Sequence, residues 1–186
     1  MAGGASCAPR RWSLPALAVE ARSRAAWRST AWMTQARKVR KRMIRKATRD
    51  DAMNVAKLAI QMWEDNTLEG LTEEMAEIIA SPESAVFLLY DGEMPVGFAQ
   101  CQLRHDYVEG TDSSPVGYLE GIFVEEGYRN KGYAKELLKQ CEAWAKDMGC
   151  SEFASDCELT NTGSLAFHLK MGFEEANRVI CFTKKL

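Results

Sequence analysis

The order of apolar and polar residues predicts a chain of short strands and helices that begins near residue 43. Segments rich in apolar residues predict strands at 43–47, 85–90, 95–104, 117–124 and 151–156, with one or two more within 173–184. Helices are predicted over 48–63, 72–80, 132–148 and 162–170. Thr48-x-x-Asp51 has the spacing of a capping box, and Asp91-Gly92-Glu93 is typical of a hairpin turn.

The order of these elements indicates the fold class. A hairpin-rich first half is followed by alternating helices and strands, which is typical of an α+β protein. We therefore expect a mixed, partly antiparallel central sheet that is flanked by helices on both faces.

Composition excludes several classes of protein. The chain has 186 residues, of which 46% are hydrophobic and 27% charged, as expected for one globular domain. No apolar run reaches the roughly 18 residues that span a bilayer, so we expect no membrane segment. The six cysteines lack zinc-site spacing, so we expect reduced thiols, no metal and a cytoplasmic protein.

Charge divides the chain near residue 42. Residues 1–42 carry ten Lys/Arg against one acid, a net charge of +9, whereas the remaining residues carry 14 against 25, a net charge of −11. Such an acidic domain favours a cationic partner over nucleic acid. The basic segment is typical of a presequence, a nucleic-acid arm or an accidental extension before the true start. We favour the extension, because Met43 opens a patterned domain, and expect 1–42 to be disordered and 43–186 to be the functional domain.

The segment Val124–Ala134 carries the most informative chemistry. An apolar strand feeds a short loop that opens directly onto a long helix, so unpaired backbone N–H groups converge on one point. Gly132 would let a ligand approach the backbone closely. The pattern favours an anion site suited to a pyrophosphate, and an ordinary turn with solvated basic side chains is the alternative.

At this loop the sequence resembles the GNAT N-acetyltransferases. Arg129-x-x-Gly132-x-Ala134 is similar to the family's pyrophosphate-binding signature, and Asn161, His168 and Gly172-Phe173 are similar to a later segment of the family. The resemblance implies the GNAT fold and acetyl-CoA as co-substrate. It implies that acetyl-CoA is bound by Ile122, Phe123, Val124, Arg129, Asn130, Lys131, Gly132, Tyr133, Ala134 and Asn161.

A narrower resemblance is to a subgroup of aminoglycoside 6′-N-acetyltransferases. It rests on residues 104–115 and 119–124, on Ala154-Ser155-Asp156 and on 172–180. It implies a homodimer that acetylates the 6′-amino group of cationic aminoglycoside antibiotics, in agreement with the acidic domain. Asn177 stands where the subgroup often has an acid, which puts the aminoglycoside range in doubt.

Two carboxylates are the main catalytic candidates. Glu120 interrupts an apolar strand, where a carboxylate is costly unless it is hydrogen-bonded or functional, and Asp156 ends the next strand. The resemblance implies that both bind substrate ammonium groups and that one acts as base. Carboxylates without a partner, at an edge or in a loop, are the alternative.

Other candidates follow from the same resemblance. Trp63, Tyr107 and Asp112 would line the substrate cleft, although a core tryptophan and plain loop residues are the alternatives. His168 would protonate the departing thiolate, or is a packed helix histidine. Asn161 would bond the pantetheine arm of acetyl-CoA, a role compatible with capping a helix.

Two other functions stay open at this point. A GNAT enzyme could act on a polyamine, another metabolite amine or a protein amine. A non-catalytic acyl-CoA-binding module, tethered to nucleic acid by residues 1–42, belongs to a different class.

Overall fold

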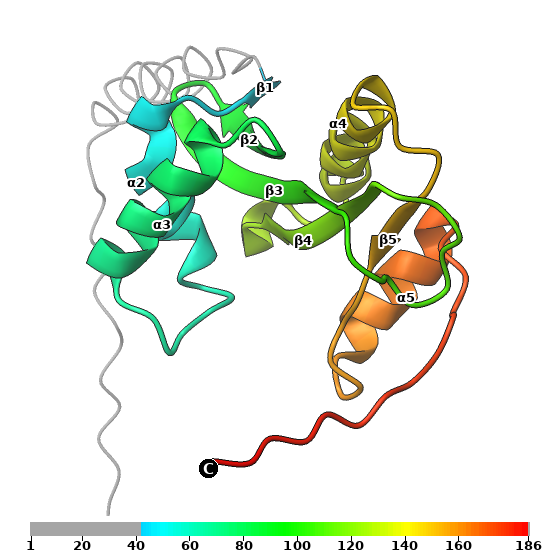
Figure 1. Cartoon of the computed structure of the whole chain (residues 1–186). Coiled ribbons are helices and arrows are strands. Elements are labelled where there is room, and N and C mark those ends of the chain that lie inside the picture. Colours follow the sequence, from blue (N-terminus) through cyan, green and yellow to red (C-terminus); the bar gives the residue numbers. More distant parts are fainter. Residues whose placement is uncertain (1–41, 186) are drawn as a thin grey trace, which may run out of the picture. The chain divides into compact units, whose positions relative to one another are not determined.

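The structure is a computed structural model that describes residues 42–185 (Figure 1). Its strands are β1 (Arg42–Lys46), β2 (Ser84–Asp91), β3 (Met94–Arg104), β4 (Val116–Val124) and β5 (Phe153–Ser155). Its α-helices are α2 (Ala52–Ala59), α3 (Leu68–Ala80), α4 (Tyr133–Asp147) and α5 (Thr162–Met171). Two short 3₁₀ helices are η1 (Arg49–Asp51) and η2 (Glu126–Tyr128). The first predicted helix is therefore shorter than expected, because a 3₁₀ turn precedes it and turns follow Ala59.

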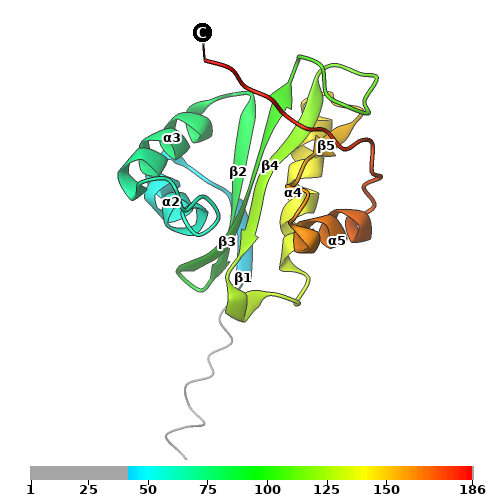
Figure 2. The same ribbon diagram turned by 90° about the horizontal axis from the view of Figure 1, so that it is seen from below.

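The five strands form one sheet in the order β1-β2-β3-β4-β5. The first four pair antiparallel, and β5 pairs parallel to β4. Helices α2 and α3 cover one face and α4 and α5 the other (Figure 2). The predicted fold class, a mixed and partly antiparallel sheet with helices on both faces, is confirmed.

Each face of the sheet has its own hydrophobic cluster. On one side, Leu71 and Met75 of α3 pack with Phe98 of β3. On the other, Leu137 and Leu138 of α4 pack on the opposite face of the same strands. This alternation buries β2 almost throughout, whereas the last three residues of β3 and Glu120 within β4 are only partly buried.

A β-bulge interrupts the pairing of β3 with β4. Gln100 lies opposite Gly121, whereas Cys101 lies opposite Leu119, so Glu120 has no partner residue on β3. A bulge bends a strand and redirects a side chain. Here it places the carboxylate of Glu120 on the same face as Gln102 and Arg104, both of which donate hydrogen bonds to it.

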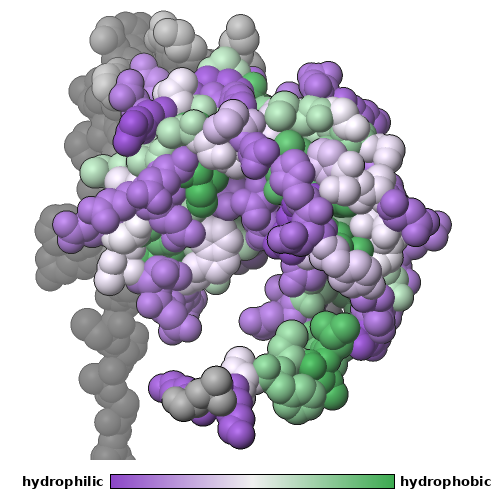
Figure 3. Space-filling model, viewed as in Figure 1, coloured by the Kyte–Doolittle hydropathy of each residue, from purple (hydrophilic) through white to green (hydrophobic). Residues whose placement is uncertain are grey.

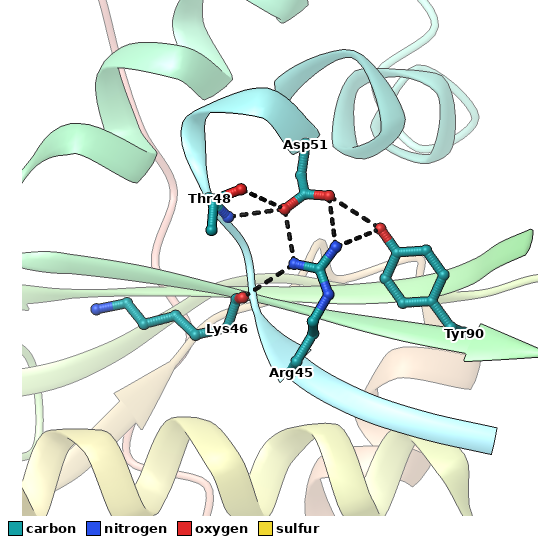
Figure 4. Close-up of polar contacts among 5 residues, drawn as sticks. All are labelled: Arg45, Lys46, Thr48, Asp51 and Tyr90. Carbon is teal, nitrogen blue, oxygen red and sulfur yellow. Dashed lines mark hydrogen bonds and ion pairs between the residues drawn. The ribbon is translucent and has the colours of Figure 1, made fainter. Parts of the chain in front are cut away.

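A partly buried ion pair fixes the corner between β1 and η1 (Figure 4). Both terminal nitrogens of Arg45 donate to the carboxylate of Asp51 at 2.7 Å. The backbone N–H and hydroxyl of Thr48 and the hydroxyl of Tyr90 also donate to Asp51, at 2.8–3.0 Å. The capping interaction predicted for Thr48 and Asp51 is present, and it forms part of a larger network.

The two ends of the chain differ from expectation in different ways. The predicted extension, residues 1–42, lies outside the described residues except for Arg42, which begins β1. The final strands predicted within 173–184 are absent from the described tail, whose Val179, Ile180 and Phe182 are 70%, 81% and 89% exposed. The C-terminal tail crosses the lower end of the view in Figure 1, and Figure 3 shows exposed apolar surface there. The strand pattern is present, but these residues pair with no strand of the described chain.

None of the helices in residues 42–185 combines the length and the apolar character that crossing a bilayer requires.

Candidate active site

The loop between β4 and α4 has the geometry of an anion site. Gly132, at the N-cap position of α4, adopts a φ of +86°, and Asn130 a φ of +60°. No side chain caps α4, so its first backbone N–H groups stay available. A Cβ built on Gly132 would meet no atom within 4 Å, so the space beside it is open. The loop therefore has the geometry of a site for an anion such as a pyrophosphate, and its contact with a cofactor stays a prediction.

The basic side chains of this loop stabilise the loop itself. Arg129 Nε donates to the carbonyl oxygen of Val124 at 2.8 Å, and Lys131 Nζ donates to that of Gly127 at 2.6 Å. Both residues are exposed, so the alternative of an ordinary turn with solvated basic side chains stays open. The backbone N–H groups at the start of α4 are donors whichever alternative holds.

Glu120 lies in a set of cationic and amide donors. Its Oε1 accepts from Gln102 Nε2 at 2.7 Å and from Arg104 Nη2 at 2.8 Å, and its Oε2 accepts from Arg104 Nη2 at 3.0 Å. The side chain is 19% exposed. The alternative of a carboxylate without a partner is therefore wrong for Glu120.

Asp156 follows β5 and is anchored by a phenol. Tyr118 of β4, which is 6% exposed, donates from its hydroxyl to Asp156 Oδ1 at 2.6 Å. Burial, followed by the hydrogen bond to this carboxylate, raises the pKa of Tyr118, so the phenol stays protonated at neutral pH. Tyr118 lies opposite Ala154, and Leu119 lies opposite Ser155. Glu120 and Asp156 are the next residues along these two neighbouring segments.

A cleft of about 590 Å³ adjoins Asp156, a size typical of small-molecule sites. It lies between β5, α5, the loop 108–111 and the tail 173–179, and it reaches Tyr118 and His168. Its lining is strongly acidic and includes Glu109, Glu142, Glu152, Asp156, Glu158, Glu174 and Glu175. The residues that line it include neither Glu120 nor Trp63 nor the loop before α4. The cleft therefore lies on the β5 side of the two carboxylates.

Comparison with known proteins identifies the family. The acetyltransferase (GNAT) family profile matches residues 53–173. Aminoglycoside N(6')-acetyltransferase type 1 of Stenotrophomonas maltophilia is 44% identical over 145 residues, which cover 77% of this chain and 93% of that protein. The chain belongs to the GNAT acetyltransferase family.

Solved structures agree with this assignment. Aminoglycoside N-acetyltransferase AAC(6')-Iy in complex with CoA is 36% identical, with a TM-score of 0.76 over 78% of this chain and 96% of that one. AAC(6')-Iy with the bisubstrate analogue CoA-S-monomethyl-acetylneamine gives a TM-score of 0.75 at the same identity, over 78% and 99%. The resemblance stated from the sequence, to GNAT enzymes and to this subgroup, is confirmed.

His168 of this GNAT protein is held on both sides of its ring. Nδ1 lies 2.8 Å from the carbonyl oxygen of Ser164, and Nε2 lies 3.0 Å from Ser155 Oγ. Ser155 Oγ in turn lies 3.1 Å from the carbonyl oxygen of Leu119. The hydroxyl of Ser164 also lies 3.3 Å from Nδ1, so both ring nitrogens have hydrogen-bonding partners. The packed arrangement is present, and the role of His168 as proton donor stays a prediction.

Asn161 caps α5, because its side chain accepts from the backbone N–H of Ser164 at 2.9 Å. The N-cap role is therefore present, and contact with pantetheine stays a prediction.

The predicted substrate-cleft residues are more scattered. Trp63 packs edge-on against Phe98, with ring centroids 6.2 Å apart, and covers Gly121 beside Glu120. Tyr107 is 81% exposed and donates to Glu109 at 2.8 Å, and Asp112 is also exposed. No described hydrogen bond joins these three side chains to Glu120 or Asp156, so their role in binding stays a prediction.

Sequence reasoning missed the residues that support the carboxylates. Gln102, Arg104 and Tyr118 were not predicted as site residues, although Arg104 opens the motif 104–115 and polar side chains alternating along 100–104 indicate a functional face. Glu152 was missed as well: it accepts from the backbone N–H groups of Asp112 and Ser113, at 3.0 and 2.7 Å, and so fixes the loop. Among residues 42–185, no cluster of His, Cys, Asp and Glu is arranged to hold a metal ion.

Proposed function

We propose that this protein transfers the acetyl group of acetyl-CoA to the 6′-amino group of an aminoglycoside. The observation that carries the proposal is the pair of carboxylates, Glu120 on β4 and Asp156 directly after β5. Aminoglycosides carry several ammonium groups, which such a site attracts. Relatives named for this activity support the same choice of substrate.

The reaction needs an unprotonated amine and a protonated leaving group. The amine attacks the thioester carbonyl, so a C–N bond forms and the C–S bond breaks, without a covalent enzyme intermediate. Asp156 and Glu120 hold ammonium groups, and one of them accepts the proton that the amine loses, directly or through water. His168 gives a proton to the departing thiolate. Ile122–Val124, Arg129–Ala134 and Asn161 hold acetyl-CoA.

Substrate comparison tests the activity. Purified protein with acetyl-CoA should acetylate aminoglycosides that have a 6′-amino group and spare those with a 6′-hydroxyl, which offer no amine. Polyamines and protein lysines serve as the comparison panel. Preferred turnover of that panel would assign a different GNAT substrate. Cells that express the protein should resist the 6′-amino compounds only.

Variants of the carboxylates test the site. Asp156→Asn and Glu120→Gln should each lose at least ~10-fold in kcat/KM, equivalent to about 1.4 kcal/mol, because each removes a charge beside the substrate. Affinity for acetyl-CoA should be unchanged. Glu73→Gln on the exposed face of α3 is the matched control. Wild-type kinetics in both site variants would contradict the assignment.

We also propose a homodimer in which each tail pairs with the other copy. In the described sheet β5 is an edge strand, and the cleft separates it from the extended residues 174–179 of its own chain. Beyond residue 179 the tail pairs with no strand of the described chain, although its Ile180 and Phe182 are apolar and exposed. A second copy's edge strand would supply such a partner.

The tail also matches the cleft in chemistry. Beyond the cleft it offers exposed Ile180 and Phe182 with Lys184 and Lys185, whereas many of the side chains that line the cleft are acidic. Sedimentation should show a dimer for the wild type and a monomer for Phe182→Asp. Met53→Asp, which changes an exposed methionine on α2, should stay dimeric. A monomeric wild type, or a dimeric Phe182→Asp, would contradict the exchange.

We infer that the protein acts in the cytoplasm. All five cysteines in residues 42–185 are free thiols, which supports a reducing compartment. Fractionation of cells that express the protein tests the inference.

A further inference from the structure

Arg104 and Tyr118 connect the two carboxylates of the site. The guanidinium of Arg104 contacts both carboxylate oxygens of Glu120 and lies 3.3 Å from the centroid of the Tyr118 ring. A planar guanidinium that forms such a pair and stacks on an aromatic ring is held in one orientation. The same ring donates from its hydroxyl to Asp156. Four side chains from β3, β4 and the residue after β5 therefore form one continuous set of contacts.

The two carboxylates differ in how many hydrogen bonds their oxygens already accept from the protein. Glu120 accepts from Gln102 and from two nitrogens of Arg104, and a neighbouring positive charge balances its own. Asp156 is exposed and accepts from Tyr118 through Oδ1, whereas no described donor contacts its Oδ2. A cation that enters the site therefore meets an uncompensated charge at Asp156 and a compensated one at Glu120.

We propose that Tyr118 is a positioning residue that acts through Asp156: its phenol, fixed by the stack on Arg104, holds one oxygen so that the other faces a substrate ammonium group. The inference rests on the proposed function. It gives the two carboxylates different shares of the work: Asp156 has an oxygen that no described donor contacts, whereas Glu120, besides its proposed contact with the substrate, keeps Arg104 in place.

Tyr118→Phe tests the role with little change of packing. The variant keeps the ring in its buried place and removes only the donor to Asp156. The KM for aminoglycoside should rise about 10-fold, equivalent to about 1.4 kcal/mol, within the range for a hydrogen bond to a charged group. The KM for acetyl-CoA should not change, because no contact of Tyr118 leads to the loop before α4. An unchanged aminoglycoside KM, or an equal change in both constants, would overturn the proposal.

A double-variant cycle tests the route. If Tyr118 acts through Asp156, Tyr118→Phe should cost nothing further in a protein that already carries Asp156→Asn. A full additional loss in the double variant would mean that Tyr118 acts by another route. Tyr90→Phe is the matched control, because Tyr90 makes the same phenol-to-aspartate contact, at 3.0 Å from Asp51, away from this site. It should lower stability and leave both KM values unchanged.

A substrate-free measurement keeps this inference separate from the proposed function. The phenol of Tyr118 donates to the charged Asp156 carboxylate, so removing that charge in Asp156→Asn should shift the near-ultraviolet absorption band of this ring at neutral pH. The Tyr118→Phe protein identifies which part of the spectrum belongs to this residue. If wild-type protein fails to acetylate any aminoglycoside but the band shifts, the proposed function fails and the contact stands. If the band does not shift, the positioning role fails whatever the activity.

Discussion

Replacing Asp51 by Asn should lower the free energy of unfolding of the domain. The substitution places a hydrogen-bond donor against other donors at the corner between β1 and η1 (Figure 4). Asp51 is 5% exposed and accepts from Arg45, Thr48 and Tyr90. An asparagine keeps the shape but turns an NH₂ group toward one of these donors. Removing one partner of a buried pair costs about 3–5 kcal/mol. Because the Arg45 side chain is 36% exposed and can be rehydrated, we expect a smaller loss, about 2–3 kcal/mol.

The loss should depend on pH in a defined direction. Hydrogen bonds from Arg45, the largest cause, hold the pKa of Asp51 far below its usual value. A carboxyl whose folded-state pKa is lowered stabilises the fold above its unfolded pKa of about 3.9, and this contribution falls as the pH approaches the folded value. The difference between wild type and Asp51→Asn should therefore be constant from pH 8 to about pH 5 and shrink below about pH 4.

Urea unfolding followed by circular dichroism measures both effects. Asp50→Asn is the matched control, since Asp50 is the exposed neighbour on the same 3₁₀ turn and should cost less than about 0.5 kcal/mol. A loss for Asp51→Asn no larger than that of the control would refute the argument. So would a difference between the two proteins that is the same at pH 7 and pH 3.5.

Three further predictions concern the loop before α4, the start of the chain and the substrate loop. Gly132→Val should reduce acetyl-CoA affinity, measured by calorimetry, at least ~10-fold, because a β-branched residue disfavours a φ of +86°; unchanged affinity would exclude the loop as the cofactor site. A protein that starts at Met43 should keep the activity and melting temperature of the full chain, and a large loss of either would give residues 1–42 a role. Glu152→Gln should speed hydrogen exchange at the amides of Asp112 and Ser113, which lose a carboxylate acceptor; unchanged protection would mean that the loop is held otherwise.

Much of the fold could be predicted because its cause is local. The helical spacing that includes Leu137 and Leu138 and the turn at Gly92 depend on near neighbours in the sequence. The tail shows where this reasoning stops. Val179–Phe182 has strand-like composition, but a strand also needs a partner edge, and no property of the segment itself specifies one.

The sequence predicted the main residues that form the candidate site, but it did not predict which side chains contact one another there. An isolated carboxylate in an apolar strand indicated Glu120, the strand–loop–helix pattern indicated the loop at Gly132, and the family resemblance gave Asp156 its role. None of these routes could show that the charge of Arg104 balances that of Glu120. These two residues are 16 positions apart in the sequence, and their contact depends on the register of β3 with β4. From the sequence alone, Arg104 is an ordinary solvated residue at the end of a strand, and only the pairing of β3 with β4 places it beside Glu120.

The register of β3 and β4 therefore determines the chemistry of Glu120. In regular pairing, side chains alternate between the two faces, so one residue more or less on β4 would turn this carboxylate toward the α4 face. There it would meet Leu137 and Cys141, where an unpaired charge is unstable. The bulge opposite Gln100 and Cys101 inserts the one residue that prevents this, and Glu120 faces Gln102 and Arg104 instead. A strand that is apolar on both sides can thus carry a carboxylate close to the acetyl-CoA loop, because the bulge lets the chain change face between Leu119 and Gly121.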